Sequence, residues 1–270
     1  MVRNNNLSNA EYCADLVITA VKNGADGFMF TVNDKALAIL GAMPNSGMLL
    51  YPLIPDASGL VRKAGGKGGV LGLAKGLAGD IIGSGGMAMM ADGVRGIVAN
   101  DPKALLRAYL RYEIGRLKSA TGGKMTLGSM LLHEILTDMA LALGMRWLFE
   151  EYVRFMTEQG IKAGFETRNF PCLVNRFEKW GLDLNGLVVA APFNKVGFQM
   201  CPSAKENKSA LTKADGAEVI AFSVLAAGRI KIRDAVKYVG GLPHITGVAI
   251  GVSNKKQAKE TFGFFAEVLG

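Results

Sequence analysis

Segments of strand length alternate with amphipathic helical segments along this 270-residue chain, and this alternation limits its possible folds more than any other feature. We predict seven strands, each followed by a helix, at 28–32, 47–54, 126–133, 163–168, the start of 186–203, 218–225 and 247–253. Repeated strand–helix units with right-handed crossovers build a parallel sheet, either open and doubly wound or closed into a barrel.

We favour the barrel, because a chain of this length routinely forms one (β/α)₈ TIM barrel. The expected architecture is α/β, with seven clear strands in a single domain over residues 1–270. The remaining first strand would have to come from the short segment 1–4, which leaves closure of the barrel open.

A glycine-rich segment at 57–97 interrupts this pattern, with glycines interleaved among Val, Leu, Ile and Met. Glycine at this density disfavours regular helix. We expect an insertion of loosely packed helices, with a lid over the barrel mouth or a phosphate-cradling loop as alternatives. An adaptable apolar surface is suggested by Met87, Met89 and Met90, and it could contact a partner chain. The sequence is therefore compatible with a homo-oligomer.

Composition restricts the classes of partner. The formal charge is +8, but the basic residues are scattered among acids, so we expect no nucleic-acid partner, whereas a small anionic ligand stays compatible. Three widely spaced cysteines and two histidines predict neither a disulfide framework nor a metal site, and indicate a reduced, cytoplasmic protein. No run is long and apolar enough to predict a membrane span.

Polar residues at the ends of the predicted strands are the candidate site residues, because a TIM barrel carries its site at the C-terminal ends of its strands. Glu166 and Arg168 should share one face of a strand, where they either bind an anionic group or form a structural ion pair. His133 and Glu134 follow another strand; one of them could cap the next helix, and His133 could transfer protons.

Further candidates follow the strand at 28–32 and the strand at the start of 186–203. Asn33 ends one strand and could bind substrate, although a capping role for this region is favoured. Asn194 and Lys195 follow an apolar run that breaks at Pro192. At the mouth of an apolar barrel, the Lys195 amine could form a Schiff base with a carbonyl substrate, bind an anion or extend to solvent.

Motifs in the second half of the chain resemble the aldo/keto reductase barrel. Residues 164–170 read Gly-Phe-Glu-Thr-Arg-Asn-Phe, similar to the motif that ends the fifth strand of that family. Residues 219–228 resemble its seventh-strand run, and residues 251–257 resemble the end of its eighth strand. By that resemblance the last motif would hold the adenosine phosphate part of NADP through Ser253, Asn254, Lys255, Gln257 and Glu260.

The chain departs from this family at the catalytic residues. The reductases use an Asp, Tyr, Lys and His tetrad, and His133 is the one member with a counterpart here. Ala190 occupies the position expected for the nicotinamide-binding Gln. The chain resembles uncharacterised prokaryotic barrels related to that family, for which the fold is implied and a standard reductase site is not.

Three functions therefore stay open. The first is binding or turnover of a small anionic or phosphorylated carbonyl metabolite, with Lys195, His133 and Glu166 as catalytic groups and Glu134, Arg168, Asn194 and Asn33 as binding groups. The second is an NADP-dependent oxidoreductase with a non-standard site. The third is a non-catalytic binding or scaffold barrel.

Overall fold

The computed structural model describes residues 9–56, 101–124 and 126–269. The expected first strand at 1–4 and the glycine-rich insertion at 57–97 lie outside these residues, as do Met87, Met89 and Met90.

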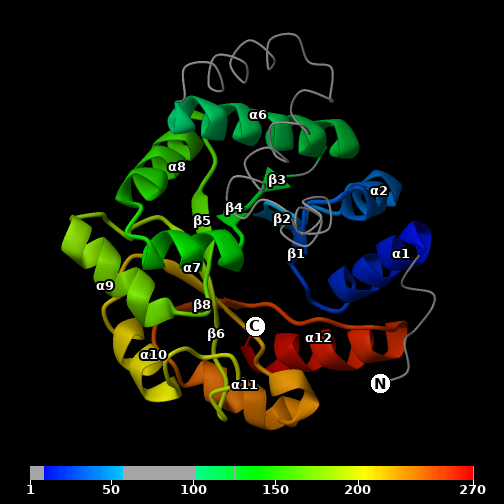
Figure 1. Cartoon of the computed structure of the whole chain (residues 1–270). Coiled ribbons are helices and arrows are strands. Elements are labelled where there is room, and N and C mark those ends of the chain that lie inside the picture. The colour runs from blue at the N-terminus through cyan, green and yellow to red at the C-terminus, as the bar shows by residue number, and fades with distance from the viewer. Residues whose placement is uncertain (1–8, 57–100, 125, 270) are drawn as a thin grey trace, which may run out of the picture.

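Parallel strands form one curled sheet, which confirms the predicted α/β barrel-like class (Figure 1). The order along the sheet is β1-β2-β4-β5-β6-β7-β8, and β3 pairs with β2. The strands are β1 (Gly27–Thr31), β2 (Leu49–Ile54), β3 (Thr126–Leu127), β4 (Met130–Leu132), β5 (Ala163–Glu166), β6 (Val188–Pro192), β7 (Glu218–Phe222) and β8 (Ile245–Val248).

Two of the predicted strands have boundaries that change where candidate site residues lie. The strand predicted at 126–133 is divided into β3 and β4, because the N–H groups of Gly128 and Ser129 both turn to the Leu50 carbonyl, at 2.9 and 3.5 Å. The strand predicted at 163–168 ends at Glu166. Arg168 therefore lies in the following loop, and the prediction that Glu166 and Arg168 share one face of a strand is wrong.

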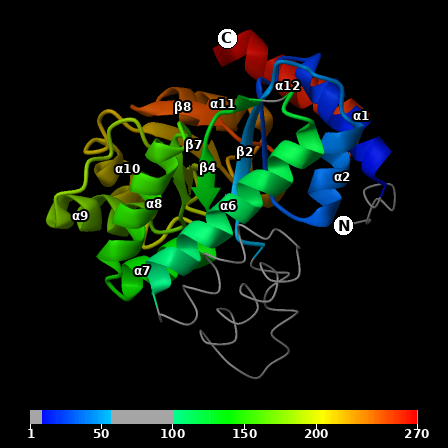
Figure 2. The same cartoon turned by 90° about the horizontal axis from the view of Figure 1, so that it is seen from above.

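Helices cover the outside of the sheet, as the view from above shows (Figure 2). They are α1 (Ala10–Val21), α2 (Asp34–Ala42), α6 (Pro102–Thr121), α7 (Glu134–Ala142), α8 (Arg146–Glu158), α9 (Phe170–Trp180), α10 (Ala204–Leu211), α11 (Ile232–Gly240) and α12 (Lys255–Leu269), with the short 3₁₀ turn η2 (Ala226–Gly228). Helix α7 begins at Glu134, two residues after the end of β4, because the side chain of His133 caps it.

The sheet separates two apolar cores. The outer core lies between strands and helices and contains the edge-to-face rings of Phe149, Phe165 and Phe177. The inner core fills the concave side of the sheet with Leu53, Leu131, Val188, Ala190 and Ile220. Both faces of the central strands are thus buried, which explains why β6 is apolar throughout.

The curled sheet has two free edges. Within residues 9–56, 101–124 and 126–269, no pairing joins β8 to β1, so the described strands form a half-barrel and not a closed ring. Helices α1 and α12 cover the opening from outside, where Leu16, Ala20 and Ala258 form a small apolar cluster. We refer to the gap between β1 and β8 as the seam.

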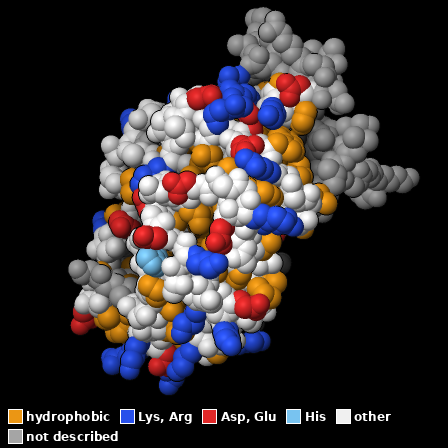
Figure 3. Space-filling model, turned by 90° about the vertical axis from the view of Figure 1, so that its left-hand side faces the viewer, with side chains coloured by type: hydrophobic (Ala, Val, Ile, Leu, Met, Phe, Trp, Pro, Cys, Tyr) orange, Lys and Arg blue, Asp and Glu red, His pale blue; other side chains and the backbone are white. Residues whose placement is uncertain are grey.

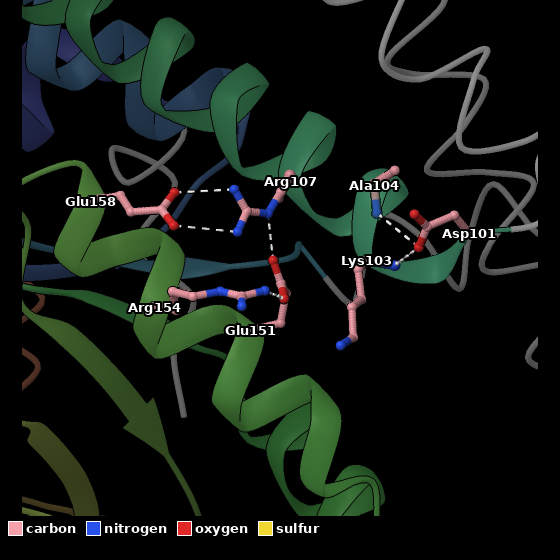
Figure 4. A network of polar contacts seen from close by, with 7 residues as sticks. All are labelled: Asp101, Lys103, Ala104, Arg107, Glu151, Arg154 and Glu158. Atoms are coloured by element: carbon pink, nitrogen blue, oxygen red, sulfur yellow. Dashed lines mark hydrogen bonds and ion pairs between the residues drawn. The ribbon is translucent and has the colours of Figure 1, made fainter.

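An ion-pair network centred on the buried carboxylate of Glu151 joins α6 to α8 (Figure 4). The guanidinium of Arg107 contacts Glu151, whose side chain is 1 % exposed, and bonds Glu158 at 3.0 and 3.3 Å. Arg154 approaches Glu151 from the neighbouring turn of α8. Charge pairing therefore allows a carboxylate to lie in an otherwise apolar helix contact.

The surface carries mixed charge. On the face drawn in Figure 3, Lys and Arg side chains are interspersed with Asp and Glu. Among the helices that the structure describes, none is both long and apolar enough to cross a membrane.

Candidate functional site

Glu166 occupies the centre of the concave face at the C-terminal ends of the strands. It is the last residue of β5, its Cα pairs with that of Ala190 on β6, and its side chain is 12 % exposed. One carboxylate oxygen, Oε2, accepts a hydrogen bond from the Glu134 N–H at 3.1 Å. Burial raises the pKa of Glu166 to about 7, because this one bond does not replace the lost hydration of the charged form.

His133 lies beside this carboxyl. Its Nδ1 is 4.0 Å from Glu166 Oε2 and accepts a hydrogen bond from the Ile135 N–H at 3.2 Å. Burial lowers the pKa of His133 below its ordinary 6.5, so the ring is neutral at pH 7. Since Nδ1 is an acceptor, the hydrogen of the neutral ring is on Nε2, which leaves this N–H able to donate.

A second ring of polar groups holds the loop after β5. The Asp138 carboxylate accepts hydrogen bonds from the Thr167 hydroxyl and, at 3.1 Å, from the Arg168 N–H. The Arg168 guanidinium in turn contacts the Glu134 carboxylate. Glu134 and Arg168 are therefore partners of each other at the rim, and both lie close to Glu166.

Asp138 is a residue that the sequence analysis missed. Burial raises its pKa, and its bonds to Thr167 and Arg168 oppose that shift. The available signal was its spacing: Asp138 follows Glu134 by four residues, which places both carboxylates on one face of α7.

A cavity of about 950 Å³ opens in front of Glu166. Its walls include inner-core residues such as Met29, Leu53 and Ile220, together with Ser223 and the turn at η2. Ser223 and Ala227 line it with left-handed backbone, at φ 53° and 56°. Non-glycine residues adopt this conformation at a cost in free energy, and such residues cluster at ligand sites.

The structure places Asn194 and Lys195 in a different setting from the one predicted. Asn194 is buried, but its side-chain amide bonds the Phe198 carbonyl and N–H, both at 2.8 Å, and so builds the loop after β6. Lys195 is exposed on that loop. Neither is among the described residues that line the cavity, and the same holds for His133, Glu134 and Arg168, which lie beside Glu166 behind its wall. Lys195 differs from these three because it is exposed, so its amine lacks the desolvation on which Schiff-base chemistry depends.

Two other predicted groups serve as helix caps. Asn33 accepts a hydrogen bond from the Ala36 N–H at 2.9 Å and caps α2. Asn254 accepts a hydrogen bond from the Gln257 N–H at 2.8 Å, at the start of α12. The Oε1 of Gln257 in turn accepts hydrogen bonds from the N–H and the hydroxyl of Ser253.

The other two residues predicted to bind a cofactor, Lys255 and Glu260, are exposed. Lys255 pairs with Asp15, and Glu260 lies 3.9 Å from Lys256. Of the five residues expected to hold a cofactor, Gln257 is the one in the described cavity wall.

Within the described ranges, no group of three or more His, Cys, Asp or Glu side chains could hold a metal ion.

Comparison with known proteins gives a structural match without a sequence match. No protein-family model matches the chain, and comparison with curated proteins finds no match. Two solved structures, each described as a proposed aldo-keto reductase from Pseudomonas aeruginosa, align with 97 % of this chain at a TM-score of 0.61 and 12 % identity. The alignments cover 86 % and 85 % of those chains. The predicted resemblance to the aldo/keto reductase barrel is thus confirmed at the level of the fold.

Proposed function

We propose that the protein is a proton-transfer enzyme that acts on a small carbonyl compound at the C-terminal end of its half-barrel. The observation that carries the proposal is the buried carboxyl of Glu166, which lines the cavity and has a pKa of about 7. A general acid or base is most effective when its pKa lies near the working pH. Near neutral pH, Glu166 is populated in both forms and can accept or release a proton.

The neighbouring groups give each step a partner. Glu166 would remove the proton from the carbon beside the carbonyl, while the Nε2–H of His133 donates a hydrogen bond to the carbonyl oxygen as it gains charge. Arg168, with Glu134 beside it, would attract an anionic group of the substrate at the rim. Lys195 has no role in this scheme, because its exposed amine is solvated.

The test is hydrogen exchange on the substrate. The protein is incubated in D₂O with a panel of ketones and aldehydes. We expect their α-hydrogens to exchange for deuterium, and NMR measures the rate of this exchange. The rate should rise with pH through about 7 as Glu166 loses its proton. Glu166→Gln should lower the rate by roughly 100-fold or more, the usual contribution of a general base.

Glu150→Gln is the matched control, because it removes one surface carboxylate on α8. A Glu166→Gln variant that exchanges at the wild-type rate would refute the role of Glu166. No exchange with any compound of the panel would refute the enzyme class.

An NADP-dependent oxidoreductase is the second candidate. Its support is the cavity itself, which reaches from Glu166 to Ser223 and to the start of α12 at Gln257. Ser253, Asn254, Lys255, Gln257 and Glu260 would then hold the phosphate part of the cofactor, and Glu166 or His133 would supply the proton. These side chains already have partners within the chain, which cofactor binding would have to replace, so this function ranks second.

Cofactor binding is tested by fluorescence. NADPH should quench the emission of Trp147 and Trp180 at micromolar concentration, and Lys255→Met should weaken the binding. Unchanged emission up to millimolar NADPH would reject this candidate.

A further inference from the structure

The cavity in front of Glu166 passes through the sheet at the seam. Met29 belongs to the inner core, whereas Phe28 and Phe30 belong to the outer core, where their rings stack at 4.9 Å. All three line the same cavity. Because neighbouring side chains on a strand point to opposite faces, one cavity can touch all three only by passing around the edge of β1.

The opposite edge shows the same arrangement. Ala249 contacts the inner core, whereas Val248 and Ile250 contact the outer core, and all three line the cavity. The cavity thus extends from the concave face through the gap between β1 and β8.

Helix α1 forms the outer wall of this passage. The α1 residues that line it are Cys13, Leu16, Val17, Ala20 and Val21. The gap runs along the five residues of β1, about 16 Å at ~3.3 Å per residue. Its walls are mostly apolar, with Glu166 at the concave face and Asp26 and Glu218 at the far end.

We propose that the ligand is a carbonyl compound with a linear apolar chain, whose carbonyl lies at Glu166 and whose chain leaves the half-barrel through the seam beneath α1. This inference rests on the proposed function and adds its substrate class. An apolar chain is stabilised by transfer from water to these walls. The cavity volume, about 950 Å³, lies in the range of small-molecule sites.

Binding of a homologous series tests the proposal. Titration calorimetry of the whole protein with 2-butanone, 2-hexanone, 2-octanone and 2-decanone should show Kd falling roughly fourfold per added methylene, until the passage is filled. A Kd independent of chain length would overturn the proposal.

A substitution at Gly247 blocks the passage without backbone strain. A Cβ there would lie 3.5 Å from Ile220 Cγ1, an ordinary van der Waals contact, and Gly247 lines the cavity. Gly247→Leu should therefore abolish the dependence on chain length. Gly263→Leu is the matched control, since nothing lies within 4 Å of a Cβ at this α12 position.

Glu166→Gln separates this proposal from the proposed function. It should lose α-hydrogen exchange and keep the chain-length dependence of binding. If exchange depends on Glu166 but Kd does not change with chain length, the enzyme class is retained and the path of the ligand chain through the seam is refuted. If Gly247→Leu does not fold, the dependence of Kd on ketone chain length in the wild-type protein decides whether the proposal holds.

Discussion

At the scale of single residues, burial decides which polar side chains can do chemistry. Glu166 and Lys195 both follow apolar strands and were both expected at the mouth of the barrel. The carboxyl of Glu166 lies in the cavity wall with one hydrogen bond from Glu134, whereas Lys195 is exposed. Only the environment of Glu166 penalises a charged side chain. A shifted pKa beside a charged partner is more typical of a functional residue than of a structural one.

The pKa of Glu166 predicts how stability depends on pH. This carboxyl has an ordinary pKa of 4.5 when unfolded and about 7 when folded, so the folded protein holds an extra proton between these values. Its contribution to the free energy of unfolding is largest below pH 4.5 and falls as the pH rises to 7, by roughly 3 kcal/mol in total.

Urea unfolding at a series of pH values measures this effect. Other carboxyls act in the opposite direction, so the decisive quantity is the difference between wild type and Glu166→Gln, which should change across this range. Glu150→Gln should show no such change. Parallel curves for wild type and Glu166→Gln would mean that Glu166 titrates normally.

At the scale of elements, the ends of helices connect sequence to site. Asp101 and Pro102 predict the start of α6, and Asp101 does cap it through the Lys103 and Ala104 N–H groups. His133 follows β4 directly, caps α7 and lies beside Glu166, so one residue connects the strand end, the helix start and the site. The sequence left open which of His133 and Glu134 is the cap, because the pattern does not fix the last residue of the preceding strand.

The contact between α6 and α8 depends on Arg107 more than on Arg154. Arg107→Met would leave the buried Glu151 carboxylate with one partner, and the free energy of unfolding should fall by about 3 kcal/mol. Arg154 is 58 % exposed, so Arg154→Met should cost about 1 kcal/mol or less. Equal losses for the two variants in chemical denaturation would contradict this account of the network.

At the scale of the whole molecule, the seam distinguishes this half-barrel from a closed one. The Asp26 carbonyl accepts from the Leu49 N–H at 2.9 Å, and the Val32 N–H donates to the Leu53 carbonyl at 3.0 Å. Backbone groups at alternate residues of β1 therefore point to β2, and those of Met29 and Thr31 point to the seam.

Amide hydrogen exchange should show this alternation. Phe28 and Phe30 should be protected, while Met29 and Thr31 should exchange at least about tenfold faster. Val189 and Ala190 on β6 serve as internal references, because β5 and β7 pair with both sides of that strand. Equal protection along β1 would show that a further strand closes the barrel.

Local patterns in the sequence were enough for the class of fold, and long-range contacts were needed for the site. Periodicity predicted the parallel strands and their covering helices, because each depends on neighbours within a few residues. It also placed Glu166 and His133 at strand ends. It could not show that Glu166 is buried 4.0 Å from His133, that Asp138 holds the loop of Arg168, or that Lys195 is exposed. Those facts depend on contacts between strands and loops some 30 residues apart, such as the 32 residues between Glu134 and Glu166. Only the folded sheet brings such segments together and removes water from between them.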